Sequence, residues 1–235
     1  MNSSPIRNRR IQIFHATLLA LALAGVVLGA IDTIRDPDPA SAAVRFERFF
    51  SYFTILSNLL VAVVSGVLTR RPAIDTAFWR VVRVIALMSI VITGLIFFVV
   101  LRPDADLHGT REIVGNALRH YVVPLLAVVG WAAFGPWPAQ AWRDLAKVMT
   151  WPLAFGAFTL VHGAVTGWYP YDFLDVGERG YGSVAVQLLI TSAEMALIAA
   201  LIVGLNRRWS RTRASGMQIA GTGASPTKPA CRTSP

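Results

Sequence analysis

Six long apolar stretches, separated by short polar segments, occupy most of this chain. Each is about 20 residues long, the length that an α-helix needs to cross a hydrocarbon core about 30 Å thick. We therefore predict an all-α integral membrane protein, a bundle of six transmembrane helices. The predicted helices cover residues 11–31, 49–68, 81–101, 113–134, 148–165 and 184–205.

The segments outside these helices give the domain organisation. We expect a basic tail over residues 1–10, one membrane domain over 11–205 and a basic, disordered tail over 206–235. The last part of the chain is rich in Ser, Thr, Gly, Pro and Ala, which leaves little apolar surface to bury. The first apolar stretch follows several arginines, as in a signal peptide, but it is longer than a typical signal core and five more stretches follow it. A spanning helix is therefore the favoured interpretation.

The distribution of charge predicts the orientation of the bundle. Of the 22 Lys and Arg residues, 15 lie in the two tails and at the second and fourth connections. The other connections are acidic, and positive charge is retained on the cytoplasmic side of a membrane. Both termini are therefore predicted to face the cytoplasm, in the inner membrane. The net charge of +9 then reflects topology and gives no reason to expect a nucleic-acid partner.

Two polar residues inside the apolar stretches attract attention, Thr54 in the second and His120 in the fourth. The predicted topology places both near the same membrane face, roughly 7–10 Å deep at 1.5 Å per residue. His162, near the end of the fifth stretch, falls at a similar depth. A hydroxyl beside an imidazole is a candidate nucleophile with its general base.

Amide side chains accompany both candidates. Asn58 follows Thr54 by four residues and Asn116 precedes His120 by four, so each lies on the same helical face as its partner. Such amides are suited to orienting a base or to stabilising an oxyanion. Pro124, one turn after His120, is expected to interrupt the hydrogen bonding of its helix, and the freed carbonyl then needs a neighbouring donor or water.

Other interpretations of these residues remain open. A threonine in a membrane helix commonly bonds to its own backbone one turn back, and a membrane histidine commonly bonds to another helix. His120 and His162 could also form a bis-histidine haem site. Cys231 is the only cysteine, so a thiolate metal site and an intramolecular disulfide are not expected.

Two further features stand out. Glu194 lies near the centre of the sixth stretch, where a carboxylate is costly, so we expect it to be buried and either protonated or hydrogen-bonded. The connection before that stretch contains Trp168, Tyr169 and Tyr171 between glycines. These aromatic residues suit the membrane interface, and together they could form a lid or pocket wall over the layer of Thr54 and His120.

The order of these motifs resembles a known family. The run Tyr-Phe-Thr-Ile-Leu-Ser-Asn around Thr54, Asn116-x-x-x-His120 followed by Pro124, and the later Val-His and Thr-Gly-Trp-Tyr-Pro runs are similar to the androgen-induced and androgen-dependent TFPI-regulating proteins. The likeness is greater to their bacterial six-helix relatives. It extends from residue 49 to residue 174, while the spacing around Pro124 and the Trp-Tyr-Pro loop differ from the eukaryotic form.

The resemblance implies an intramembrane threonine hydrolase that cleaves fatty acid esters of hydroxy fatty acids or similar lipids. Thr54 and His120 match the essential threonine and histidine of that family. Asn58 or Asn116 would then donate to the oxyanion, and His162 would orient His120 or bind substrate. This chemistry requires no metal or other cofactor, and the expected partners are membrane lipids and a lipid ester. The alternative is a lipid-binding or transport protein that uses the same pocket without catalysis.

Overall fold

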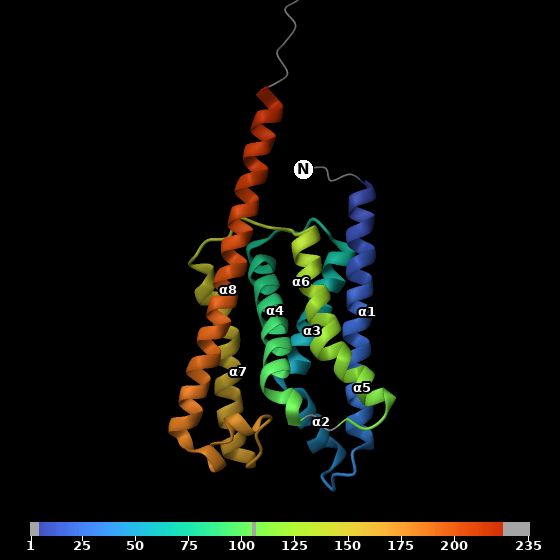
Figure 1. The fold of residues 1–235 in the computed structure, drawn as a ribbon, viewed down its shortest axis with the longest axis vertical. Helices are drawn as coiled ribbons and strands as arrows, with labels where there is room; N and C mark the ends of the chain where they lie inside the picture. Colours follow the sequence, from blue (N-terminus) through green and yellow to red (C-terminus); the bar gives the residue numbers. More distant parts are fainter. Residues whose placement is uncertain (1–4, 105–106, 223–235) are drawn as a thin grey trace, which may run out of the picture.

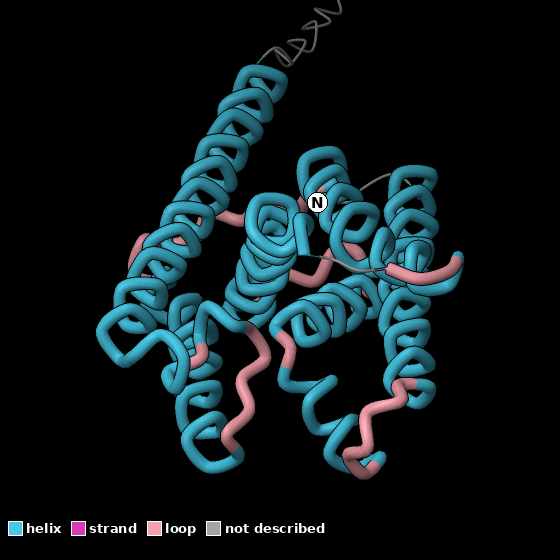
Figure 2. The backbone as a smooth tube through the Cα atoms, turned by 60° about the horizontal axis from the view of Figure 1, so that its bottom comes forward, coloured by secondary structure: helices cyan, strands magenta, loops and turns pink. Residues whose placement is uncertain are grey.

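The computed structural model describes residues 5–104 and 107–222, and it confirms the predicted six-helix bundle. Six segments are long and apolar enough to cross a membrane: Ile6–Arg35, Phe53–Arg70, Ala77–Leu101, Thr110–Phe134, Asp144–Thr166 and Val176–Thr212. Helices joined by short loops make up nearly all of the described backbone, and this part of the chain contains no strand (Figure 2). The protein is therefore a multi-pass membrane protein.

Helices of several kinds build these segments. The α-helices are α1 (Pro5–Arg35), α2 (Ala42–Ser51), α3 (Phe53–Arg70), α4 (Ala77–Ile96), α5 (Thr110–Ala117), α6 (Val123–Phe134), α7 (Asp144–Thr166) and α8 (Val176–Thr222). Two π-helical turns extend or link them, η1 (Phe97–Leu101) after α4 and η3 (Leu118–Val122) between α5 and α6. Short 3-10 turns form η2 (Arg102–Asp104) and η4 (Asp172–Leu174).

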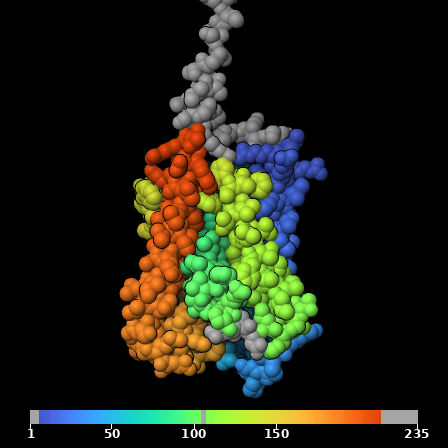
Figure 3. All heavy atoms as spheres, viewed as in Figure 1, coloured from blue at the N-terminus to red at the C-terminus, as the bar shows by residue number. Residues whose placement is uncertain are grey.

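Helix α4 lies at the centre of the bundle. It packs against α3, α6, α7 and α8, while α1 packs mainly along α3 (Figure 1). Met88, Ile90 and Ile92 of α4 are completely buried, which makes this helix the middle of the main apolar core. On one face α8, the end of α4, α6 with α5, and α1 follow one another across the molecule (Figure 3).

The bundle has two distinct ends. The first turn of α1, the connections 71–76 and 135–143 and the last turns of α8 share one end, which we call the terminal end (Figure 1). Helix α2 and the connections 36–41 and 167–175 share the opposite end, which we call the loop end. The first helix therefore begins, and the last helix ends, at the same end of the bundle, as six membrane crossings require.

The second predicted helix is interrupted. Residues 49–68 were expected to form one helix, but Tyr52 has extended backbone angles (φ −76°, ψ 128°) and separates α2 from α3. The ring of Tyr52 makes edge-to-face contacts with Trp168 and Tyr171 in the connection 167–175. These contacts hold Tyr52 out of the helix, so that α3 begins at Phe53.

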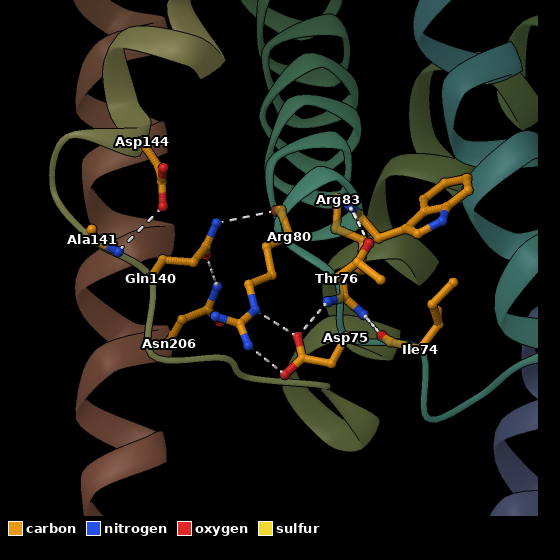
Figure 4. Close-up of polar contacts among 10 residues, drawn as sticks. Ile74, Asp75, Thr76, Arg80, Arg83, Gln140, Ala141, Asp144 and Asn206 are labelled. Carbon is orange, nitrogen blue, oxygen red and sulfur yellow. Dashed lines mark hydrogen bonds and ion pairs between the residues drawn. The ribbon is translucent and has the colours of Figure 1, made fainter.

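The last helix is longer than predicted. Residues 206–235 were expected to be disordered, but α8 continues to Thr222, and only residues 223–235 of that tail lie outside the described residues. Asn206 bonds to Gln140, and Arg207 donates to the Gln140 carbonyl. Gln140 in turn donates to the backbone of Arg80, which pairs with Asp75 (Figure 4). This network ties residues 206 and 207 of α8 to α4 and to both connections of the terminal end, so the helix continues past the predicted span at these residues.

Candidate active site

The break at Tyr52 determines what the Thr54 hydroxyl can bind. Several threonines in this protein bond to the carbonyl four residues earlier, as Thr33 does to Gly29 and Thr69 to Ser65. Thr54 is the second residue of α3, so the residue four positions before it lies across the break, in α2. The ordinary acceptor of a helical threonine is therefore displaced, and the hydroxyl is available to a neighbouring helix.

That neighbour is His120. The Thr54 Oγ1 and the His120 Nε2 are 3.4 Å apart, although the two residues are 66 positions apart in the chain. Thr54 is 9% exposed, so the contact is largely shielded from solvent. The distance is longer than a typical hydrogen bond, and catalytic pairs without substrate commonly tighten when substrate binds. The predicted proximity of Thr54 and His120 is confirmed.

Asn116 selects the tautomer of the neutral imidazole. The His120 Nδ1 lies 2.7 Å from the Asn116 side-chain oxygen and 3.2 Å from the Asn116 carbonyl oxygen. Because a carbonyl oxygen only accepts hydrogen bonds, Nδ1 carries the proton of the neutral ring. The Nε2 atom is then an unprotonated acceptor that faces the Thr54 hydroxyl. The sequence suggested Asn116 for orienting a base or for an oxyanion, and the geometry matches the first role.

The helix that carries His120 is widened at that residue. His120 lies in the π-helical turn η3, and Pro124, four residues later, is the second residue of α6. Proline has no N–H to bond the carbonyl of His120, and such turns often occur at functional sites. The ring of Phe97, in the other π-helical turn, stacks on the imidazole with centroids 3.9 Å apart and planes 13° apart. Hence two irregular turns hold the imidazole in place.

Asn58 has a different role from the one predicted. Its amide nitrogen donates to the Thr54 carbonyl at 2.9 Å and to the Arg119 carbonyl at 3.3 Å. Both donor hydrogens are therefore committed to backbone, one of them to a carbonyl of the widened turn. The expected oxyanion contact from Asn58 is not available, because its N–H groups lock α3 to η3 instead.

His162 and two of the predicted lid residues lie elsewhere. The imidazole of His162 pairs with Glu47 of α2 and contacts the ring of Trp168, which also stacks against the Arg48 guanidinium. Tyr169 packs onto Gly163, where an added Cβ would overlap its ring. None of the three lines the cavity at Thr54. His120 is oriented by Asn116 rather than by His162, and a haem held between the two histidines has no geometric support because each ring has other partners.

A cavity of about 490 Å³ opens at Thr54 and His120 on the side of the loop end. Its wall combines apolar side chains with Asp32, Arg119, Asp172 and Arg179. Tyr171 also lines it, as predicted, and burial raises the pKa of this phenol to about 12, although contacts with Thr54 act in the opposite direction. A second, mostly apolar cavity of about 60 Å³ lies on the other side of Thr54, among α4, α7 and α8. Thr54 and Tyr171 belong to both cavities.

Glu194 contradicts the expectation of a buried carboxyl. It is exposed on the outside of the bundle, where it lines a surface hollow of about 300 Å³ between α4 and α8 together with Gln187 and Phe173. Gln187 bonds to Thr191 on the same helix. The burial of Glu194 was predicted wrongly because of how α8 is rotated about its axis. Met195 faces the core, and Glu194 beside it faces outward.

Comparison with known proteins adds no assignment, since the chain matches no protein-family model, no curated protein and no solved structure.

Arg119 is the residue of this site that sequence reasoning missed. It donates to the Gly25 carbonyl at 2.7 Å, and its side chain packs against Gly25, Gly29 and Gly115. The signal was present as an arginine inside an apolar stretch, next to His120, together with glycines four residues apart in the first stretch. Small residues at that spacing let another element approach closely.

Proposed function

We propose that this protein is an intramembrane hydrolase of lipid esters, with Thr54 as nucleophile and His120 as general base. The observation that carries the proposal is the continuous contact from Thr54 through His120 to Asn116. It supplies the three parts of an activated hydroxyl: a nucleophile, a base within reach, and a group that orients the base. The stacked ring of Phe97 adds a further restraint on the base.

The reaction follows from these positions. The Thr54 oxygen attacks the ester carbonyl carbon while its proton passes to the His120 Nε2, and the carbonyl electrons move onto the oxygen. When this oxyanion collapses, the alcohol leaves and takes the proton from His120. Water, activated by the same imidazole, then releases the acid from Thr54. The balance is one ester and one water converted to one acid and one alcohol.

The cavities beside Thr54 fit a lipid ester. Together they provide an apolar wall and a few charged groups, and the lining of the larger one reaches the loop end. The resemblance to the androgen-induced and androgen-dependent family favours fatty acid esters of hydroxy fatty acids as the substrate class. We also propose the inner membrane as the location, with both termini in the cytoplasm, from the distribution of positive charge.

A fluorophosphonate probe tests the proposal, because it reacts with an activated hydroxyl and stays attached. We expect purified wild-type protein to be labelled at Thr54 and the Thr54→Ala and His120→Ala variants to remain unlabelled. The size of the cavity also favours a second function, lipid binding or transport without chemistry. A carrier forms no covalent adduct at Thr54, so the same experiment separates the two.

A further inference from the structure

The proposed reaction needs a hydrogen-bond donor for the oxyanion, and the contacts of the two asparagines at the site are directed to backbone and to the imidazole. Both N–H groups of Asn58 are bonded to backbone carbonyls. Asn116 presents its oxygen to His120. Removing one such donor typically costs an enzyme about 10²–10³ in kcat, so its position matters for the mechanism.

Tyr171 occupies the required place. Its side chain lines both cavities that meet at Thr54. Edge-to-face contact with Tyr52 and stacking on Phe173, with centroids 5.6 Å and 5.1 Å apart respectively, hold the ring in position. The phenol is therefore a positioned donor at the reacting hydroxyl rather than a mobile side chain in a loop.

The start of α3 lies beside this donor. The first N–H groups of a helix lack partners within the helix, and Tyr52 gives α3 no side-chain cap. Tyr171 lines both cavities together with Thr54, the second residue of this helix. Negative charge is stabilised at the N-terminus of a helix, so the helix start favours an oxyanion at the same place.

The phenol also keeps its proton. Burial raises the pKa of Tyr171 to about 12, while the contacts with Thr54 and Phe53 lower it. A group with this pKa is neutral throughout the range in which an ester hydrolase works, so its O–H remains available.

We propose that the Tyr171 hydroxyl is the oxyanion donor of this site, and this inference rests on the proposed hydrolase function. As Thr54 attacks, the ester carbonyl oxygen becomes negatively charged and accepts the hydrogen bond from Tyr171. The phenol keeps its proton throughout, and no other co-reactant than water is needed. Tyr171 is thus a catalytic residue, and the connection 167–175 contributes to chemistry as well as to covering the cavity.

The test compares purified Tyr171→Phe with wild type in hydrolysis of p-nitrophenyl butyrate. We expect kcat to fall about 10²-fold with KM little changed, because the hydrogen bond forms mainly in the transition state. Inhibition by phenylboronic acid, which forms a tetrahedral adduct on a reactive hydroxyl, should weaken by a comparable factor. The control is Tyr181→Phe, which removes the same hydroxyl from an exposed tyrosine at the loop end.

The outcomes separate this inference from the proposed function. If wild type hydrolyses the ester and Thr54→Ala does not, but Tyr171→Phe retains full kcat, the oxyanion assignment is wrong and the hydrolase stands. If wild type neither hydrolyses the ester nor reacts with the probe, the oxyanion assignment and the proposed hydrolase function are both wrong.

A second variant covers the case in which Tyr171→Phe does not fold. Difluorotyrosine at position 171 preserves the ring and lowers the pKa of the phenol. We expect the alkaline loss of kcat to move to lower pH, since the donor then loses its proton earlier. An unchanged profile overturns the assignment.

Discussion

At the scale of single residues, the site depends on the hydrogen-bond partners of two side chains, Thr54 and His120. The helix break at Tyr52 removes the usual backbone acceptor of the threonine. The two oxygens of Asn116 hold the imidazole in the tautomer that can accept a proton. The proposed nucleophile and base are therefore positioned by backbone geometry and one amide.

The orienting role of Asn116 leads to a prediction. Asn116→Ala removes the 2.7 Å contact to Nδ1 but leaves the longer contact to the backbone carbonyl. We expect kcat to fall by about 10–10², less than the roughly 10⁴ lost when a triad is left with the wrong tautomer. Steady-state kinetics check this, with Gln187→Ala on the outer face of α8 as a control for loss of an amide. Unchanged kcat in Asn116→Ala means that the imidazole is oriented by other contacts.

The sequence was informative about residues whose spacing along one helix decided the contact. Asn116 and His120 are four residues apart, so their meeting followed from helical geometry. The roles of Asn58 and His162 depended on partners from other segments, a backbone carbonyl of η3 and Glu47 of α2. The exposure of Glu194 depended on the rotation of α8 about its axis. The sequence does not reveal this rotation, because apolar residues occur all around the helix.

At the scale of elements, irregular turns place the proposed reactive groups. His120 and Phe97 lie in two π-helical turns that face each other, and Thr54 begins a helix after a break. Composition and periodicity predict where apolar helices lie but contain no comparable signal for a turn widened by one residue. Pro124 was the one visible indication of the irregularity.

Gly94 permits the approach of α4 to the turn that carries His120. A Cβ at this position would lie 3.1 Å from the His120 carbonyl oxygen and 3.2 Å from Pro124. We expect Gly94→Ala to destabilise the protein by about 1–3 kcal/mol through overpacking and to lower kcat by displacing the base.

Thermal unfolding in detergent and ester hydrolysis measure these effects. Gly66→Ala is the matched control, since its Cβ would meet only Leu19 at an ordinary 3.8 Å and alanine favours helix by about 1 kcal/mol. Equal stability and activity of the two variants contradict the close-packing argument.

At the scale of the whole molecule, the two ends of the bundle differ in role. The terminal end is closed by the polar network from Asp75 to Asn206 (Figure 4). The loop end holds the cavity with Thr54, His120 and Tyr171. The bundle itself was predictable from the six apolar stretches, whereas the extension of α8 was not, because it depends on contacts with a distant connection.

The charge distribution predicts how this molecule sits in the membrane. We expect a reporter fused at Asp104 to give an extracytoplasmic signal and one fused at Arg143 a cytoplasmic signal, since positive charge is retained inside. Alkaline phosphatase and fluorescent-protein fusions measure the two cases. The reversed pattern would place the site on the cytoplasmic side.

The proposed chemistry depends on Thr54 being an activated nucleophile. The most direct measurement is the mass of purified, folded protein after reaction with a fluorophosphonate probe, with the modified peptide sequenced. We predict one adduct, on Thr54, in the wild type, reduced labelling in Thr54→Ser, and none in Thr54→Ala, in His120→Ala or in the double variant, because both residues serve one chemical step. Full labelling of Thr54→Ala would contradict the account, because the reactive hydroxyl would then lie elsewhere in the chain.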